Sequence, residues 1–571
     1  MRKIPFHALL VLSVIGAFVL VACSPSLARP TEPAQPELSE PSALGAEAPG
    51  TLRVGTTYIW DTPNPTTGWY NQTLRYLLYD TLIEEAGIDN LKPGLAETWT
   101  ASNDGLVWTF KIRPGVTFHD GTPCTAEDIA WSLNWSIEHH VPTFSPYLIH
   151  PDGTSPFKGI VALDPSTVQM TLLEPMSDLE YVLAYVWILP RSVWEGRSPD
   201  EILKFEDLAA GIGTGPYKLV DWVEGESLIL EANQAYWPGA PAIGRIVWHE
   251  FATKDAVVEA LLAGDIDVVA VDTIPLAAME AVRAAENVRA LSMASTGINE
   301  LIINSHERGT QIASLNNPTV RLAIAHAIDK QRIVNEAALG YAEQASVVIP
   351  PSMGDWHNRD LKDVPFDLDE ANRILQEAGY KDTDRDDVRE DAKGVPLRYR
   401  LYASQDATSA RVLEIISDGL SQVGIATVLV AMDEESLLAR VRNYDFDLAY
   451  WGWELDADPG LAMSIFTCSQ RQGRKSDTKR TTPLSGGLND SGYCNEEFDA
   501  MYQQQATTTD NQARRQLIWQ MQDKLFNDRP YIMLTYVNAL QAYRSDRFTG
   551  FGLAAGDILW KAALLQARPV Q

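Results

Sequence analysis

Helical stretches that end at a glycine and lead into a short apolar run most constrain what this chain folds into. In 254–263 the apolar residues recur at helical spacing, and Gly264 follows directly. Glycine ends a helix at this position because it adopts a left-handed backbone without steric cost. Strand-like runs follow such helices at 266–269 and 425–430. Helices that alternate with buried strands in this way predict α/β layers with largely parallel sheets.

Length and charge narrow the class of protein further. The chain has 571 residues, more than one hydrophobic core accommodates, so two or three domains are expected. Its formal net charge of −30 repels nucleic acid, which is therefore excluded as a partner. Apolar residues make up 45% of the chain, enough for a sizeable core.

The N-terminus has the order of a secretory signal peptide. Arg2 and Lys3 precede an apolar run from about Ala8 to Ala22, shorter than the ~20 residues that a bilayer span needs. The run ends in a Leu-Val-Ala-Cys tetrad that closes at Cys23 and resembles the lipobox of bacterial lipoproteins. That resemblance implies a signal peptide over 1–22, cleavage before Cys23, and acylation of the Cys23 thiol.

Residues 23–50 predict a disordered tether. They are rich in proline, alanine, serine and glutamate, and such a stretch buries too little apolar surface to fold. Proline keeps the chain extended, which suits a link between a lipid anchor and a folded body. The expected location is therefore the cell membrane, on its periplasmic or outer face.

The remaining cysteines are Cys124, Cys468 and Cys494. In an oxidising compartment Cys468 and Cys494 are the candidate disulfide pair, since they are nearest in sequence, although spacing alone does not settle cysteine pairing. Cys124 is then expected to be a small buried residue.

Several motifs together resemble the bacterial extracellular solute-binding proteins of family 5, which serve peptide and nickel ABC importers. The motifs lie in a long block over 91–129, in Gly213-Thr214-Gly215-Pro216-Tyr217, in Gly264-Asp265-Ile266-Asp267, and over 320–329 and 444–453. The resemblance spans about residues 51–570. It implies an α/β, two-lobed, hinged periplasmic-binding-protein-like fold of class II, with an extra subdomain on the first lobe.

The same resemblance implies the lobe boundaries. Lobe I is expected over 51–300, with an inserted subdomain at about 84–209. Lobe II is expected over 301–540, and residues 541–571 should return to lobe I. Solute is expected to be enclosed between the lobes, which close about a hinge.

Asp456 is the leading candidate for a ligand-binding residue. In peptide-binding members of the family, an aspartate in this register anchors the ligand's α-amino group, and here the matching segment runs from Gly452 to Asp456. A carboxylate opposite an ammonium makes a charge-assisted hydrogen bond. The alternative is that Asp456 or Asp458 only shapes the turn before Pro459, which arrives one residue earlier than in some relatives.

Aromatic side chains are expected to line the binding region, as they do in most small-ligand sites. The candidates are Trp451, Trp453, Tyr58 and Trp60, which lie at predicted strand ends. Stacking on these rings would suit a sugar as well as a peptide side chain. The alternative is that these residues are core.

No catalytic, cofactor or metal-binding motif is predicted. The chain shows no nucleophile elbow, zinc-protease helix or phosphate loop. The acidic run from Asp382 has Asp387 and Lys393 where a calcium-binding EF-hand loop needs glycine and glutamate. Neither a cofactor nor a metal is therefore expected.

The sequence predicts a monomeric, non-enzymatic binding protein that delivers a di- or oligopeptide to the permease subunits of an ABC importer. An oligosaccharide or a nickel chelate remains an alternative ligand within the family. The alternatives from other classes are a secreted hydrolase and a surface receptor without an importer.

Overall fold

The structure, a computed structural model, describes most of the chain from Gly50 onward. The described residues are 50–58, 62–67, 72–88, 90–149, 153–307, 309, 312–471, 487–553 and 556–570. The predicted signal peptide over 1–22, the tether as far as residue 49, Cys23 and Trp60 lie outside the described residues.

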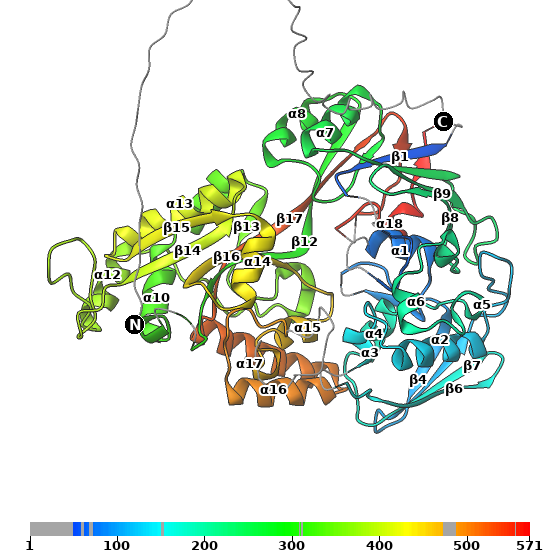
Figure 1. Ribbon diagram of the computed structural model, residues 1–571, viewed down its shortest axis with the longest axis horizontal. Helices are drawn as coiled ribbons and strands as arrows, with labels where there is room; N and C mark the ends of the chain where they lie inside the picture. The colour runs from blue at the N-terminus through cyan, green and yellow to red at the C-terminus, as the bar shows by residue number, and fades with distance from the viewer. Residues whose placement is uncertain are drawn as a thin grey trace, which may run out of the picture. The chain divides into compact units, whose positions relative to one another are not determined.

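A mixed sheet of 11 strands forms the frame of the described chain (Figure 1). Its strands, in spatial order, are β15 (Ala426–Met432), β14 (Arg398–Ser404), β16 (Leu448–Glu454), β12 (Val288–Ile303), β17 (Tyr531–Arg544), β11 (Val268–Val269), β1 (Thr51–Thr56), β10 (Arg245–Glu250), β9 (Ser227–Ala232) and β8 (Tyr217–Val223). The remaining strand, β13 (Ala342–Gln344), pairs with β17.

Two long antiparallel strands, β12 and β17, run through both halves of this sheet. Residues 288–294 of β12 pair with 538–544 of β17 beside β11 and β1, and residues 298–302 pair with 531–536 beside β16. The register shifts between Ala294 and Ile298, as at a β-bulge. We propose that the boundary between the lobes lies at this shift, a few residues from the expected positions 300 and 540.

The prediction of largely parallel sheets holds for only part of the main sheet. Parallel pairs join β1 to β10 and β11, and join β14 to β15 and β16. The pairs that involve β12 and β17 are antiparallel, as are the β8, β9 and β10 pairs. β8, β9 and β10 follow one another along the chain and need no helical crossover. β12 and β17 are instead separated by the helices α9 to α17, so no local pattern indicates that they pair.

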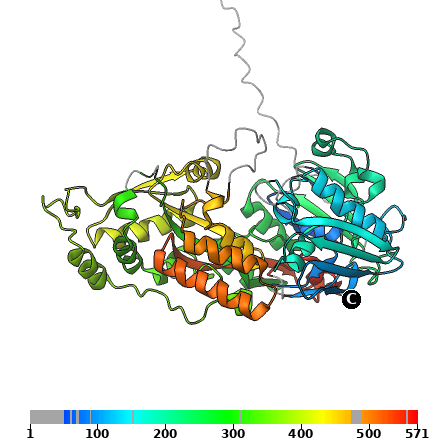
Figure 2. The ribbon, with the colours of Figure 1, turned by 90° about the horizontal axis from the view of Figure 1, so that it is seen from below.

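Helices cover both faces of the half-sheet beyond the register shift. One core packs Leu301 and Ile303 against α9, α10, α12 and α13, and another packs Ile298 and Ile302 against α14 to α17. This alternation along β12 is the period-two pattern of a strand buried on both faces. Figure 2 shows α16 and α17, in orange, side by side. The helices of this part are α9 (Ile312–Leu315), α10 (Pro318–Ala327), α11 (Lys330–Arg332), α12 (Leu368–Glu377), α13 (Ala407–Ser421), α14 (Glu434–Arg442), α15 (Pro459–Ser464), α16 (Glu496–Thr507) and α17 (Asn511–Asp528).

The segment predicted as an inserted subdomain contains a separate antiparallel sheet of order β4-β5-β7-β6. The strands before and within it are β2 (Ile83–Glu85), β3 (Leu91–Pro93), β4 (Ala96–Ala101), β5 (Val107–Ile112), β6 (Phe157–Asp164) and β7 (Thr167–Leu172). The helices on either side of it and against it are α1 (Gln72–Leu78), α2 (Ala126–Glu138), α3 (Ser145–Leu148), α4 (Leu179–Tyr185), α5 (Arg191–Trp194) and α6 (Pro199–Leu203). Its apolar side chains join the core of β1, β9 and β10, so the subdomain and that half of the sheet share one core.

The remaining elements complete the half of the sheet that contains β1. They are α7 (Lys254–Ala263), α8 (Met279–Ala284), α18 (Lys561–Leu564), β18 (Phe548–Thr549) and β19 (Arg568–Pro569), with short turns at η1 (Leu208–Gly211), η2 (Leu276–Ala278), η3 (Ile333–Ala337), η4 (Pro351–Trp356) and η5 (Cys468–Gln470). Gly264 ends α7 with a left-handed φ of 86°, as the sequence predicts. Among the helices of the described residues, none combines the length and the apolar character needed to cross a bilayer.

Candidate functional site

Strand β16 carries two of the predicted aromatic residues into one lobe. Trp451 and Trp453 lie two residues apart, so they share a face of the strand, and both pack against the core that contains Ile298. The indole Nε1 of Trp453 donates a hydrogen bond to Asp490 Oδ2 at 3.1 Å. Both rings are partly exposed. Their positions therefore combine the predicted core role with some access to solvent.

The segment after β16 assigns different roles to Asp456 and Asp458. Asp458 begins α15 by accepting the Gly460 amide at 2.7 Å, and both its oxygens accept from the buried Arg514, at 2.6 and 2.7 Å. The structural role that the sequence left open between the two aspartates thus belongs to Asp458. The carboxylate of Asp456 instead accepts a hydrogen bond of 3.4 Å from the Tyr147 hydroxyl.

A pair of tyrosines from the inserted subdomain meets Asp456. The rings of Tyr147, on α3, and Tyr185, on α4, stack with centroids 5.2 Å apart and planes 10° apart. The Tyr185 hydroxyl accepts the amide of Ala457 at 3.3 Å and donates a hydrogen bond to the carboxylate of Glu85. Figure 1 shows α3 and α4 beside α15, the helix that follows this segment. The subdomain and the lobe that contains β16 therefore meet at Asp456.

Burial shifts the protonation of both carboxylates at this meeting point. It raises the pKa of Asp456 to about 6, against the opposing hydrogen bond from Tyr147 and together with the nearby charge of Asp458. It raises the pKa of Glu85 to about 7, against the hydrogen bond from Tyr185 and together with the charge of Asp456. At neutral pH Asp456 is mostly ionised and Glu85 is about half ionised, and the ionised form of each gains from a cation that replaces lost water.

Glu454, the last residue of β16, adds a third carboxylate. It accepts a hydrogen bond from the Thr296 hydroxyl at 2.9 Å, and Thr296 lies within the register shift of β12. Although Glu454 contacts solvent, the protein atoms packed around it raise its pKa to about 7, and Asp272 and Asp456 add to the rise. The candidate site is therefore acidic and lies next to the hinge strands.

The other predicted aromatic residues are placed less fully. Tyr58 follows β1, its amide donates to the Thr56 hydroxyl at 3.2 Å, and its side chain is 41% exposed. Trp60 lies outside the described residues. The predicted residues that the structure describes near one another in the chain thus have different partners. Trp453, on β16, contacts Asp490. Asp456, just after β16, contacts Tyr147.

Sequence reasoning missed Glu85, Tyr147 and Tyr185. Glu85 directly follows residues 71–84, whose apolar residues recur at helical spacing and predict a helix. The two tyrosines lie in the subdomain with no motif around them. Only the packing of the subdomain against the segment after β16 brings them to Asp456. A single sequence carries no signal for that contact.

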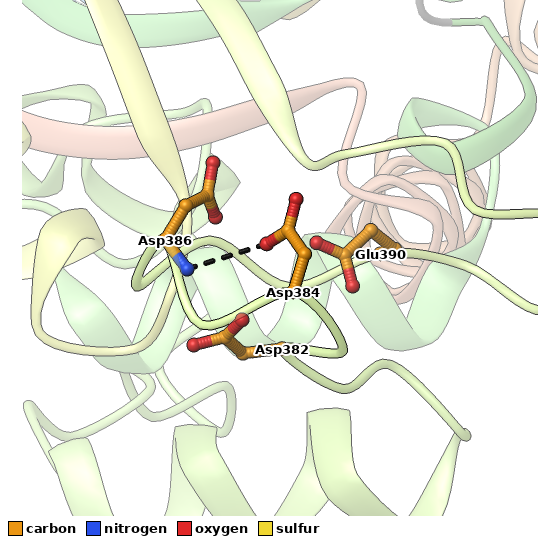
Figure 3. Close-up of side chains that lie close together, drawn as sticks. All are labelled: Asp382, Asp384, Asp386 and Glu390. Atoms are coloured by element: carbon orange, nitrogen blue, oxygen red, sulfur yellow. Dashed lines mark hydrogen bonds between the residues drawn. The ribbon is translucent and has the colours of Figure 1, made fainter.

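Four carboxylates cluster elsewhere, in the loop between α12 and β14 (Figure 3). Asp382, Asp384, Asp386 and Glu390 each offer an oxygen within 4.8 Å of the others. The first three are exposed, and Asp384 Oδ1 accepts the Asp386 amide at 3.2 Å. Such geometry is also common in acidic loops that bind no ion, and the absence of a metal stays a prediction.

Cys468 and Cys494 are joined by a disulfide in the structure, with Cα atoms 4.5 Å apart. Cys124 is buried and free. The bond ties the segment after α15 to the start of α16, and Cys468 N donates to Asp499 on that helix at 3.0 Å.

The two-lobed fold is that of the periplasmic solute-binding proteins. A family model for bacterial extracellular solute-binding proteins, family 5 Middle, matches residues 90–474. The chain belongs to family 5 of the bacterial extracellular solute-binding proteins, which work with ABC importers.

Known proteins resemble the chain over nearly its whole length. Glutathione-binding protein GsiB of Shigella flexneri serotype 5b (strain 8401) is 28% identical over 518 residues, which cover 88% of this chain and 91% of GsiB. NikZ from Campylobacter jejuni, solved with Ni(L-His), has a TM-score of 0.75 and 23% identity and covers 91% of this chain and 100% of its own. AppA from Bacillus subtilis, solved with a nonapeptide, has a TM-score of 0.71 and 22% identity, covering 91% and 99%.

Proposed function

We propose that this protein binds a di- or oligopeptide outside the cytoplasm and delivers it to the permease of an ABC importer, without catalysing a reaction. The ligand's α-amino group pairs with Asp456. The observation that carries the proposal is that the two aspartates after β16 differ in their contacts. Asp458 binds Arg514 and begins α15. Asp456 has no cation within 4.0 Å among the described residues, and its one hydrogen-bond donor there is a neutral hydroxyl.

The family supports the class, and the relatives illustrate the range of ligands within it. GsiB is named for glutathione, a peptide with a free amino group, and AppA holds a nonapeptide. NikZ holds a nickel chelate, so a chelate is the alternative ligand, and an oligosaccharide is another. We also propose that acylated Cys23 anchors the protein to the membrane and that 23–50 acts as the tether.

The test is calorimetric titration of the purified protein with Ala-Ala-Ala, N-acetylated Ala-Ala-Ala, an oligosaccharide and Ni(L-His). The free tripeptide should bind and its acetylated form should not. Asp456→Asn should weaken tripeptide binding about 30-fold or more, because an unpaired buried ammonium costs at least about 2 kcal/mol.

Asp255→Asn serves as the control for the lost charge, since Asp255 lies on α7 and is exposed. It should bind the tripeptide as the unmodified protein does. Binding of only the sugar or the chelate would overturn the peptide assignment, and hydrolysis of any of these compounds by the pure protein would overturn the non-enzymatic one.

A further inference from the structure

Glu85 is a buried carboxylate that lacks a partner for one of its oxygens. It ends β2, its residue is 9% exposed, and Oε2 is buried with no hydrogen-bond partner in the described chain. The carboxylate receives one hydrogen bond, from the Tyr185 hydroxyl. A buried charged oxygen without a partner is costly, so such an atom in a native site points to a group that is bound there.

The neighbouring acid on the same strand shows what Glu85 lacks. Glu84 is also buried, but Lys561 Nζ lies 3.2 Å from its Oε1 and Lys92 Nζ lies 3.6 Å from the same atom. No lysine, arginine or histidine of the described residues lies within 4.0 Å of the Glu85 carboxylate. Two adjacent buried glutamates thus differ in that the protein supplies a cation to only one of them.

Acidic residues around Glu85 make a positively charged partner for it more favourable. Asp456 raises the pKa of Glu85 and of Glu454, and Asp272 raises the pKa of Glu454 and of Asp557. The acids of the described chain that act on one another here therefore include Glu85, Asp456, Asp458, Glu454, Asp272 and Asp557.

The described cations that act on these acids or on Tyr147 are fewer. Arg514 pairs with Asp458 at 2.6 Å, and Arg75 acts on Tyr147. Arg75 donates to the Thr67 carbonyl oxygen at 3.0 Å and lies 5.2 Å from the centroid of the Trp187 ring. Lys254 begins α7 and lowers the pKa of Asp272, against the larger effect of burial. The described groups around the site are thus negative in sum, and this charge favours a ligand with more than one positive charge.

We infer that the protein selects peptides whose first residue is lysine or arginine, with the α-amino group on Asp456 and the side-chain cation on Glu85. The stacked rings of Tyr147 and Tyr185 join the two carboxylates, since each tyrosine hydroxyl donates to one of them. The aliphatic stem of a basic side chain packs well on such aromatic surface while its charged end reaches a carboxylate. This inference rests on the proposed function and specifies its substrate class.

The test is calorimetric titration of the purified protein with Lys-Ala-Ala, norleucine-Ala-Ala and Glu-Ala-Ala. Norleucine keeps the stem of lysine without its charge. We expect Lys-Ala-Ala to bind about tenfold or more tightly than norleucine-Ala-Ala, because a hydrogen bond to a charged group contributes at least about that factor. Glu-Ala-Ala should bind most weakly, and the advantage of lysine should shrink as salt concentration rises.

Glu85→Gln should remove the advantage of lysine and leave norleucine-Ala-Ala binding unchanged. Asp456→Asn should weaken both peptides. Glu195→Gln is the control for net charge, since Glu195 is exposed and pairs with Arg191, and it should keep the advantage. Circular dichroism checks that each variant is folded, and the salt dependence of the unmodified protein tests the inference if Glu85→Gln does not fold.

The outcomes separate this inference from the proposed function. Equal binding of the lysine and norleucine peptides would overturn the inference and leave the peptide function standing. A lysine advantage that survives in folded Glu85→Gln would overturn the role of Glu85. Failure of every free-amino peptide to bind would overturn the proposed function itself.

Discussion

At Gly213 and Gly215 the backbone passes so close to the end of α1 that a side chain does not fit. A Cβ on Gly213 would lie 2.2 Å from Leu78 O, and one on Gly215 would lie 2.5 Å from Leu78 C. The Gly215 amide donates to Leu78 O at 2.9 Å, which holds the crossing in place. His119 closes it from the other side, with Nε2 3.0 Å from Gly215 O. Burial lowers the pKa of His119 to about 4, so it is a neutral structural residue.

Gly215→Ala should destabilise the fold by about 3 kcal/mol, because the atoms that its Cβ would meet are backbone atoms that cannot turn away. The midpoint of urea unfolding, followed by tryptophan fluorescence, measures the effect. Gly244→Ala is the matched control, since nothing lies within 4 Å of its added Cβ. Equal midpoints for the two variants would contradict the crossing described here.

Individual residues also show how much of the candidate site could be predicted from the sequence. Asp456 comes from a family pattern, and its role as the anchor of an amino group stays a prediction. The different roles of Asp456 and Asp458 become clear only from the contact of Asp458 with Arg514, which lies 56 residues further along the chain. Glu85 and the two tyrosines needed a subdomain contact that no local pattern encodes.

At the scale of elements, local patterns give the type of an element better than its extent. The helical pattern of 317–339 predicts one helix, but the structure ends α10 at Ala327, and η3 over 333–337 is a π-helix. Ile328 is extended with ψ 115°, and the chain restarts at Asp329, whose side chain accepts the Arg332 amide at 3.0 Å. The break lets buried Lys330 donate to Ala345 O at 2.9 Å, a tertiary contact outside any helical window.

The helix predicted over 71–84 is likewise too long. It ends at Leu78, and Ile83–Glu85 forms strand β2. The amides of Leu95 and Ala96 pair with Thr81 O and Leu82 O, both at 3.0 Å. Backbone pairing with a distant segment thus outweighs the local helical periodicity.

A buried ion network joins α18 to the segment that contains Asp80 and Glu84. Lys561 on α18 is 1% exposed, and its Nζ lies 2.8 Å from Asp80 Oδ1 and 3.2 Å from Glu84 Oε1. Tyr236 and Trp237 donate to the two Asp80 oxygens at 3.1 and 3.0 Å. Burial lowers the pKa of Lys561, but Asp80 and Glu84 together raise it well above the ordinary value, so the residue stays charged.

Lys561→Met should destabilise the protein by about 3–5 kcal/mol, because it leaves two buried carboxylates without their common cation. The same urea unfolding measurement reports the loss. Lys362→Met is the control, since Lys362 is exposed and donates only to Arg359 O in the described chain. A loss below about 1 kcal/mol in Lys561→Met would show that the network contributes little.

At the scale of the whole molecule, the two lobes meet on more than the hinge strands. The Ser177 amide donates to Ala506 O at 2.9 Å, which joins the subdomain to α16. The Tyr185 contact to Ala457 is a second contact of this kind, and Ala457 directly follows Asp456. Two-lobed organisation follows from the family motifs, whereas the identity of these contacts follows only from the packed structure.

The proposed pairing of Asp456 with an amino group predicts that ligand binding depends on pH. The pKa values of about 6 for Asp456 and about 7 for Glu85 and Glu454 lie above those of unfolded chains. As the pH falls from 7 towards 4, the folded protein therefore takes up protons before the unfolded chain does. The free energy of unfolding of the ligand-free protein rises as these groups are protonated. Protonation removes the charge that attracts an ammonium, so it weakens binding over the same range.

The affinity for a free-amino tripeptide should consequently fall about tenfold or more between pH 7.0 and pH 5.0, since a carboxyl with a pKa of about 6 changes from mostly ionised to about one-tenth ionised. Calorimetry at both pH values measures the fall, and the ligand-induced rise in melting temperature should shrink with it. Asp456→Asn should bind weakly at both pH values with a shallower dependence. An affinity that stays constant across this range would show that the carboxylates do not hold the amino group.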